Sequence, residues 1–397
     1  MLPEFPIFSQ NIYDVKAIRI PGVLIGAAIV IPIFFAGCNK PNAVEKLKKE
    51  PFGNAKNGEE VYRYTIHNSQ GAYISVITFG AILQEVCMPD RRGKITDLVL
   101  GYDSLDKYLV KNAQFGTVVG RYGNRIARGH FRLDSTDYQL ATNNGPNHLH
   151  GGPQGFDKKV WEAEPVSGNG YGAVKLHYLS RDGEEGYPGN LDVYVTYTLN
   201  DRNEIRIDYQ ATTDKPTVLN LTNHSYFNLN GQGSGDVLGE ELTLMCDQYL
   251  PTDSTAIPLG APAEVAGTPF DFRSPHSIGE RIYVDNEQLH FGKGYDHSFI
   301  IRGNPGTLRP AARLVDKNSG RVLEVLTTQP AVQLYIGNNL NNTFTGKAGK
   351  GYDKYYAVCL ETQHYPDSPN HPEYPTTVLR PGQNFSESTV FRFSVEK

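Results

Sequence analysis

Residues 193–209 read VYVTYTL-NDRN-EIRIDY, and this stretch decides the fold class of the chain. In its first and last parts apolar and polar residues alternate, which is the period of a β-strand. The four residues between them, Asn200 to Asn203, are typical of a turn. The stretch therefore predicts an antiparallel hairpin of two strands, Val193–Leu199 and Glu204–Tyr209.

Strand-like runs of the same kind recur from residue 60 onward, and short helices are expected only at Ser104–Val110 and Ser277–Arg281. The other runs are Tyr73–Phe79, Ala81–Met88, Val174–Leu179, Glu240–Met245, Ser298–Ile301, Arg321–Thr327, Val332–Ile336, Tyr356–Glu361 and Thr389–Val395. Turn signals separate them at short intervals. We therefore expect an all-β fold, a large antiparallel sandwich or barrel, formed as one domain by residues 60–397.

Composition and charge limit the classes of function. The chain has 397 residues, enough for a large core, and a formal net charge of −5, so no basic surface for nucleic acid is expected. Cys87, Cys246 and Cys359 each lie in an apolar run, and the sequence has no Cys-x-x-Cys pair. We therefore expect buried thiols, without a disulfide framework or a structural zinc site.

The N-terminal residues differ from the rest of the chain. An apolar run at 20–37 follows Lys16 and Arg19 and ends in Phe35-Ala36-Gly37-Cys38. This pattern is typical of a secretory signal peptide, and its end resembles the bacterial lipobox, although that pattern prefers Leu where Phe35 stands. We expect a signal peptide at 1–37, lipidation of Cys38 and a flexible tether at 38–59. The protein would cross the inner membrane and be lipid-anchored in the periplasm or at the outer membrane.

The densest polar cluster lies at residues 219–228, which read LNLTNHSYFN. His224 is of a type that exchanges a proton near neutral pH, and Tyr226 would face the same side of a strand. A structural histidine is the alternative. Glu361, which ends the apolar run 356–360, favours chemistry, because loss of water there would raise its pKa and improve it as a base. A solvated strand end is the alternative for Glu361.

Three further polar islands interrupt the strands, at residues 120–126 (GRYGNRI), 147–152 (NHLHGG) and 294–299 (GYDHSF). The first either binds sugar hydroxyls or forms a surface turn. In the second, His148 and His150 would share one face of an extended strand, which suits a metal, but no carboxylate or cysteine ligand is near, so no metal is expected. Asp296 in the third is either a turn residue or part of a site.

Together and in this order, the islands resemble those of the aldose 1-epimerases, or galactose mutarotases. The motifs that carry the resemblance are GRYGNRIA at 120–127, NHLHGG at 147–152, LTNHSYFNL at 221–229, GYDH at 294–297 and LETQHYPD at 360–367. The resemblance runs from about Tyr64 to Val395. It implies the family's β-supersandwich of antiparallel strands, here in a lipoprotein-type bacterial member.

The resemblance also implies roles for individual residues. His224 would be the general acid and Glu361 the general base of an isomerase that interconverts the α and β anomers of free aldohexoses, such as glucose or galactose. The sugar-binding residues that it implies are Asn124, Arg125, His148, Tyr226, Asp296 and Gln329. Two proton-transfer groups need no cofactor, and no convincing set of calcium ligands is found. The expected partner is a free sugar, bound by a monomer that meets the membrane only through its lipid anchor.

Two other classes of function remain open at this point. A glycoside hydrolase or lyase on a similar sandwich would need two carboxylates, which Asp296 and Glu361 could supply. A sugar-binding module would need no acid–base pair. These residues do not distinguish glucose, galactose, xylose and arabinose as substrates.

Overall fold

The computed structural model describes residues 46–110 and 113–396, which belong to the compact unit Val44–Lys397. The predictions for the signal peptide at 1–37, for Cys38 and for the tether as far as residue 45 lie outside the described residues. Among the residues that are described, no helix has the length and apolar character needed to cross a bilayer.

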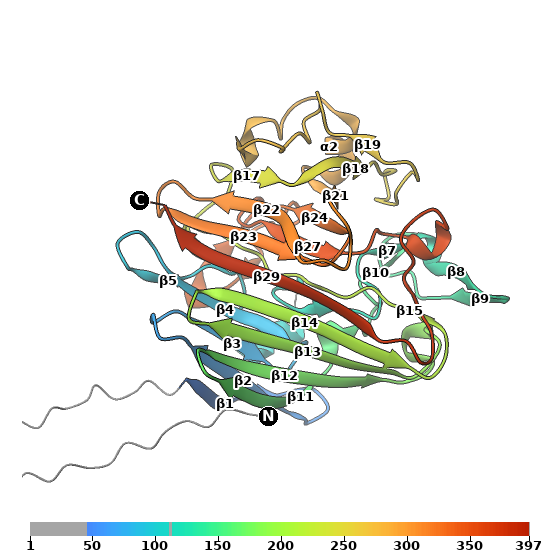
Figure 1. Ribbon diagram of the computed structural model, residues 1–397, viewed down its shortest axis with the longest axis horizontal. Helices are drawn as coiled ribbons and strands as arrows, with labels where there is room; N and C mark the ends of the chain where they lie inside the picture. The colour runs from blue at the N-terminus through green and yellow to red at the C-terminus, as the bar shows by residue number, and fades with distance from the viewer. Residues whose placement is uncertain (1–45, 111–112, 397) are drawn as a thin grey trace, which may run out of the picture. The chain divides into compact units, whose positions relative to one another are not determined.

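A nine-stranded antiparallel sheet is the largest element of the fold (Figure 1). It contains the hairpin predicted at residues 193–209, and buried positions alternate with more exposed ones along both strands of that hairpin. The order across the sheet is β11 (Glu162–Gly168), β12 (Tyr171–Ser180), β13 (Leu191–Asn200), β14 (Glu204–Thr213), β29 (Phe385–Val395), β23 (Arg321–Thr327), β22 (Arg309–Val315), β17 (Glu241–Leu244) and β20 (His276–Ser277).

A first five-stranded antiparallel sheet packs on one part of this large sheet, where β2 meets β12 and β3 meets β13. Its order is β1 (Leu47–Asn54), β2 (Glu60–His67), β3 (Tyr73–Ile77), β4 (Ile82–Pro89) and β5 (Ile95–Asp97). Ile74 of β3 and Val195 of β13 belong to one buried apolar cluster between the two sheets. Each such buried side chain contributes about 1.5–3 kcal/mol of transfer free energy.

A second five-stranded antiparallel sheet shares the same core. Its order is β19 (Ala263–Glu264), β18 (Cys246–Leu250), β21 (Asp296–Ile301), β24 (Ala331–Tyr335) and β27 (Cys359–Gln363). Val332 of β24 and Leu360 of β27 join the apolar cluster that also holds Leu323 of β23. The predicted all-β supersandwich is confirmed.

Shorter elements connect the sheets. The two-stranded pairs are β6 (Val118–Val119) with β16 (Thr222–Asn223), β7 (Arg125–Ile126) with β10 (His148–Leu149), β8 (His130–Leu133) with β9 (Thr136–Gln139), β15 (Thr217–Val218) with β28 (Val378–Leu379), and β25 (Phe344–Thr345) with β26 (Gly351–Tyr352). The helices are α1 (Leu105–Val110), α2 (Glu287–Gly292) and the 3₁₀ turns η1 (Ala127–Gly129), η2 (Phe156–Lys158), η3 (Glu184–Gly186), η4 (Ile278–Glu280), η5 (Lys347–Gly349) and η6 (Ser368–Asn370). α1 and η4 lie where short helices were predicted, whereas α2 was not predicted.

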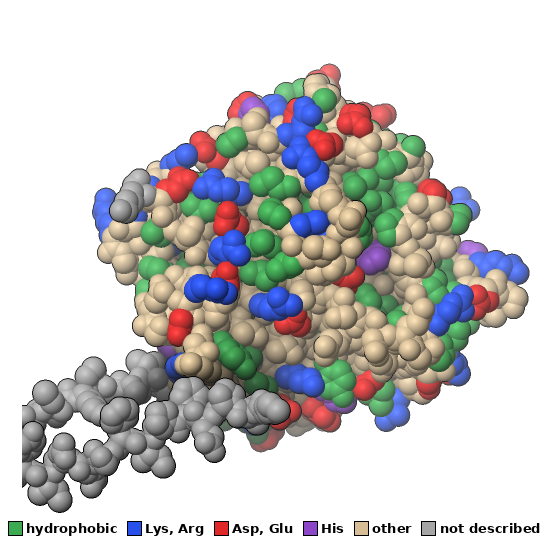
Figure 2. All heavy atoms as spheres, viewed as in Figure 1, with side chains coloured by type: hydrophobic (Ala, Val, Ile, Leu, Met, Phe, Trp, Pro, Cys, Tyr) green, Lys and Arg blue, Asp and Glu red, His purple; other side chains and the backbone are tan. Residues whose placement is uncertain are grey.

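The distribution of surface charge and the burial of the three cysteines agree with what the composition predicts. On the face shown in Figure 2, basic and acidic side chains are interspersed rather than gathered by sign. Charged side chains of the described residues also form ion pairs, such as Arg302 with Asp247 at 2.6 Å. Cys87, Cys246 and Cys359 are free and buried, as predicted.

The predicted tether is wrong from Leu47 onward. Residues 47–54 form β1, which pairs with β2 along the edge of the first five-stranded sheet. Leu47 and Phe52 pack against the buried core. The sequence concealed this strand because Lys48 and Lys49 hold exposed positions, as charged residues of edge strands often do. The folded unit therefore begins well before Glu60.

A tight turn after β10 brings two sequence motifs into backbone contact. Gly151 follows His150 with φ at +78°, and a Cβ atom placed on it would lie 1.9 Å from the carbonyl oxygen of Gly120. Gly120 begins the motif that carries Asn124 and Arg125. Only glycine fits this contact, because both its backbone angle and the missing side chain are required.

Gly151→Ala is therefore expected to lower the free energy of unfolding by roughly 3 kcal/mol or more, since the added methyl group would overlap a backbone oxygen. Gly145→Ala is the matched control. Gly145 also has a positive φ, +59°, but open space surrounds it, so the expected loss is about 1 kcal/mol. Denaturant unfolding measures both, and equal losses would contradict the argument.

Candidate active site

A cavity of about 210 Å³ lies between the strands β21, β24 and β27 and the loops that carry the sequence motifs. Six residues predicted for the site line this cavity: Asn124, Arg125, His224, Tyr226, Asp296 and Glu361. The predicted residues His148 and Gln329 are not part of its wall. His150 and Gln333 are, although they were not predicted.

Backbone bonds hold the segments of His224 and Glu361 together. Phe227 and Val358 form an antiparallel bridge, with mutual N–H···O bonds of 2.8 Å. His224 lies three residues before Phe227 and Glu361 three residues after Val358, and their Nε2 and Oε1 atoms lie 3.6 Å apart. The side chain of Asn220 adds a second link between the two segments, since its Oδ1 accepts a backbone N–H just beyond β27 at 2.9 Å.

Three neighbouring strands present polar side chains on one face of the second five-stranded sheet. Gln333 on β24 is opposite Glu361 on β27, and Asp296 on β21 is opposite Tyr335 on β24. Because side chains two residues apart on a strand point the same way, these groups share the cavity face. The Nε2 of Gln333 donates to Oδ1 of Asp296 at 2.6 Å, so Gln333 is a direct partner of one of the two carboxyl groups.

The structure corrects the prediction for Gln329. Its side chain is fully buried, and its Nε2 donates to the carbonyl of Leu221 at 3.4 Å within the core. Gln333 takes the place predicted for it. The signal in the sequence was a glutamine inside the apolar run 332–336, because a buried amide in a strand needs a hydrogen-bond partner.

The structure also corrects the prediction for His148. Its ring is fully buried, with Nδ1 donating to the carbonyl of Ala141 at 2.7 Å and Nε2 accepting from the hydroxyl of Tyr187 at 2.7 Å. The expectation that His148 and His150 share a strand face is wrong, because β10 ends at Leu149 and His150 has a left-handed φ of 52°. The turn points His150 into the cavity instead.

Asn124 enters the cavity from the loop that precedes β7, and Arg125 enters it from β7 itself. The Nε of Arg125 donates to Oδ1 of Asn144 at 3.1 Å, and its Nη1 donates to Oδ1 of Asn124 at 3.4 Å. The backbone of Asn124 in turn bonds to His150, whose N–H donates to the Asn124 carbonyl at 3.0 Å. These bonds fix a cation and several donors beside the carboxyl groups.

His150, His224 and Glu361 place one ligand-type atom each within 4.8 Å of one another, which is close enough to consider a metal. The hydrogen bonding argues against it. The backbone N–H of Asn124 donates to Nδ1 of His150 at 3.1 Å, so a neutral ring carries its proton on Nε2 and has no lone pair left for a metal. The cluster suits hydrogen bonding and proton transfer, with His150 as a donor.

Burial dominates the protonation of the acid–base pair. It lowers the pKa of His224 to about 4. Burial and the neighbouring Asp296 carboxyl raise the pKa of Glu361 well above its usual value, while the charge of Arg125 opposes this shift. In the sugar-free cavity burial therefore favours the neutral form of each group. Because their Nε2 and Oε1 atoms lie 3.6 Å apart, the protonation of one group depends on that of the other.

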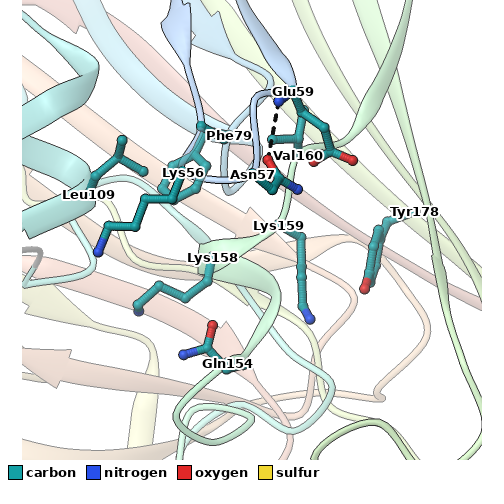
Figure 3. Close-up of a pocket in the computed structure, with 11 residues that line it drawn as sticks. Lys56, Asn57, Glu59, Phe79, Leu109, Gln154, Lys158, Lys159, Val160 and Tyr178 are labelled. Carbon is teal, nitrogen blue, oxygen red and sulfur yellow. Dashed lines mark hydrogen bonds between the residues drawn. The ribbon is translucent and has the colours of Figure 1, made fainter.

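A second cavity, of about 520 Å³, lies between the β1–β2 turn and the loop before β11 (Figure 3). Lys56, Lys158 and Lys159 contribute to its wall, which contains no histidine. Lys158 forms an ion pair with Asp157, and Lys159 lies 3.5 Å from Glu184. Without a histidine, this wall cannot supply a histidine–carboxylate pair, so the smaller cavity is the candidate active site.

The fold and this site define an all-β enzyme that transfers protons to and from a small polar molecule. The sequence model of the family described as aldose 1-epimerase matches residues 62–392 of the chain. The chain therefore belongs to the aldose 1-epimerase family, and it is an isomerase that interconverts the anomers of aldoses.

Individual relatives give the extent of this similarity. The galactose mutarotase of Bos taurus is 47% identical over 322 residues, which cover 81% of this chain and 91% of the relative. The aldose 1-epimerase of Escherichia coli (strain K12) is 38% identical over 344 residues, 86% of this chain and 98% of the relative. The solved structure of galactose 1-epimerase from Lactobacillus acidophilus NCFM has a TM-score of 0.79 at 31% identity, and the match covers 89% of this chain and 99% of that one.

Gln333→Met is expected to raise the KM for an aldose by about tenfold, because a donor inside the cavity is lost and Asp296 loses its partner. Gln329→Met is the matched control, since Gln329 lies outside the cavity wall, and its KM is expected to stay at the wild-type value. Steady-state polarimetry at several sugar concentrations gives both constants. A raised KM in Gln329→Met with an unchanged KM in Gln333→Met would instead support the original prediction that Gln329 binds the sugar.

Proposed function

We propose that the enzyme interconverts the α and β anomers of free aldohexoses such as galactose and glucose, with His224 as general acid and Glu361 as general base. The observation that carries this proposal is the position of the two side chains, whose Nε2 and Oε1 atoms lie 3.6 Å apart inside one cavity. The names of the relatives support the choice of hexoses, because those proteins are galactose mutarotases.

The reaction needs two opposite proton transfers. Glu361 takes the proton of the anomeric hydroxyl while His224 gives its proton to the ring oxygen, and the C1–O5 bond breaks to leave the open aldehyde. Rotation about C1–C2 turns the other carbonyl face, and ring closure reverses both transfers. In the productive form of the pair, His224 carries the proton that it donates and Glu361 is ionised. The positive charge of Arg125 favours this carboxylate form of Glu361.

The remaining polar groups of the cavity hold the sugar. Asn124, Arg125, His150 and Gln333 supply donors, and Asp296 supplies an acceptor. Because C1 must turn while the rest of the ring stays in place, we place the firm contacts at the hydroxyl groups away from C1. Neither a cofactor nor a metal is part of the proposed mechanism, and the enzyme is proposed to act as a monomer.

Glu361→Gln is expected to lower kcat by about 10²–10⁴, because the amide cannot accept the proton, with little change in KM. Glu387→Gln is the matched control, since Glu387 is a largely buried carboxyl group with a raised pKa that lies outside this cavity. Polarimetry of freshly dissolved α-D-galactose and α-D-glucose follows the rate. Wild-type rates in Glu361→Gln would eliminate Glu361 as the base.

We also propose that the enzyme is exported across the inner membrane and lipid-anchored through Cys38, in the periplasm or at the outer membrane. The support is the lipobox-like sequence at 35–38. Since β1 begins at Leu47, the proposed tether shortens to about eight residues, which reach at most about 28 Å when extended.

Cells that express the full chain and take up an alkyne-tagged fatty acid are expected to label the wild type but not Cys38→Ser, because that thiol is the proposed acceptor. Cys87→Ala, which removes a buried thiol of β4, is expected to keep the label. Fractionation of the same cells should move Cys38→Ser out of the membrane pellet. A labelled Cys38→Ser protein would exclude this anchor.

A further inference from the structure

His224 lacks a hydrogen bond from its second ring nitrogen to any other described residue. A catalytic imidazole normally donates from its second nitrogen to a carbonyl or a carboxylate, which fixes both the tautomer and the ring plane. In His224 the Nδ1 atom is buried, and no other residue among those described supplies a hydrogen bond to it. Something else must hold the ring with Nε2 directed toward Glu361.

Aromatic rings pack around the imidazole of His224 instead. The ring of Tyr226 stacks on the imidazole of His224, with centroids 4.9 Å apart and an angle of 22° between the planes. Tyr335 meets both rings nearly at right angles, with centroid distances of 6.0 Å to His224 and 5.9 Å to Tyr226. The imidazole is therefore held on one face by a parallel ring and along one side by a perpendicular one.

Tyr226 is itself fixed at both ends. Its hydroxyl donates to the carbonyl of Ala113 at 2.9 Å, so the hydroxyl already has a partner within the protein. Phe115 packs edge-on against its ring, with centroids 5.0 Å apart. A residue anchored in this way is suited to hold a neighbour rather than to follow a sugar.

We propose that Tyr226 is a positioning residue, whose ring holds the imidazole of His224 in the plane that aligns Nε2 with Glu361 and stabilises the imidazolium form. This replaces the expectation that Tyr226 binds the sugar, and it rests on the proposed role of His224 as the acid. The π face of an aromatic ring attracts a cation that lies within about 6 Å of its centroid, and the stack satisfies this distance.

Two substitutions separate a positioning role from sugar binding. Tyr226→Phe keeps the stacked ring and loses the hydroxyl with its bond to Ala113, whereas Tyr226→Leu loses the ring. We expect Tyr226→Phe to keep KM and to hold kcat within about threefold of the wild type, and Tyr226→Leu to lose about tenfold or more in kcat with KM within about twofold. Tyr355→Phe is the matched control, because it removes a hydroxyl bond to the Lys293 carbonyl outside the cavity wall.

The pH profile of kcat gives a second measurement that a merely structural role would not change. Activity falls at low pH when the pair of His224 and Glu361 binds a second proton, and at high pH when it loses its only one. Without the Tyr226 ring the imidazolium is less stable, so the acidic limb of Tyr226→Leu is expected to move to lower pH. The other titratable and charged groups around the imidazole, unchanged in this variant, are Glu361, His150, Tyr335, Asp296 and Arg125.

Two results would overturn the proposal. One is a KM about tenfold higher in Tyr226→Phe with kcat preserved, which would make the hydroxyl a sugar ligand. The other is a wild-type kcat and pH profile in Tyr226→Leu. If Tyr226→Leu unfolds at the assay temperature, Tyr226→Met takes its place with the same expected outcomes. Full activity in His224→Asn would instead show that His224 is not the general acid. A failure of the proposed function is therefore distinguishable from a failure of the positioning role of Tyr226.

Discussion

The antiparallel bridge between Phe227 and Val358 is the constraint on which the site depends. It fixes the backbone three residues after His224 and three residues before Glu361, and a shift of one residue there would turn one of the two side chains away from the other. With this register, two titratable groups that would be costly to bury alone face each other across a short distance. The aromatic rings of Tyr226 and Tyr335 then pack on the imidazole of His224, whose backbone position is already fixed. The loops with Asn124 and His150 only complete a site that the strands have set.

The electrostatics of the cavity follow from the same placement. Asp296 and Glu361 lie on one face of a sheet, so burial favours the protonated form of both, and the Asp296 carboxyl further favours protonated Glu361. Arg125 opposes both shifts, and the amide of Gln333 favours the ionised form of Asp296. In the proposed mechanism, His224 and Glu361 together carry a single mobile proton. Such a pair can donate one proton and accept another in the same reaction without leaving an unpaired buried charge on either group.

The sequence predicted the fold better than the details of the site. The β13–β14 hairpin was visible because its alternation is regular, and the motif order located six of the residues that line the cavity. The errors have local physical causes. The strand β27 begins three residues later than Tyr356, because the apolar residues before it pair as a bridge with Phe227 and not in the sheet. β1 was missed because lysines on an edge strand hide its pattern, and His150 was passed over because a left-handed turn is invisible to strand periodicity.

The hydrogen bond from the backbone of Asn124 to Nδ1 of His150 has a consequence for how the enzyme responds to its surroundings. A proton cannot enter that nitrogen without breaking a bond to the main chain, and burial further lowers the pKa of His150 well below its ordinary value. Both effects favour the neutral form of His150, in which Nε2 carries the proton. In the proposed site, the hydrogen bond that His150 offers to the sugar therefore does not rely on a change in the charge of its own ring.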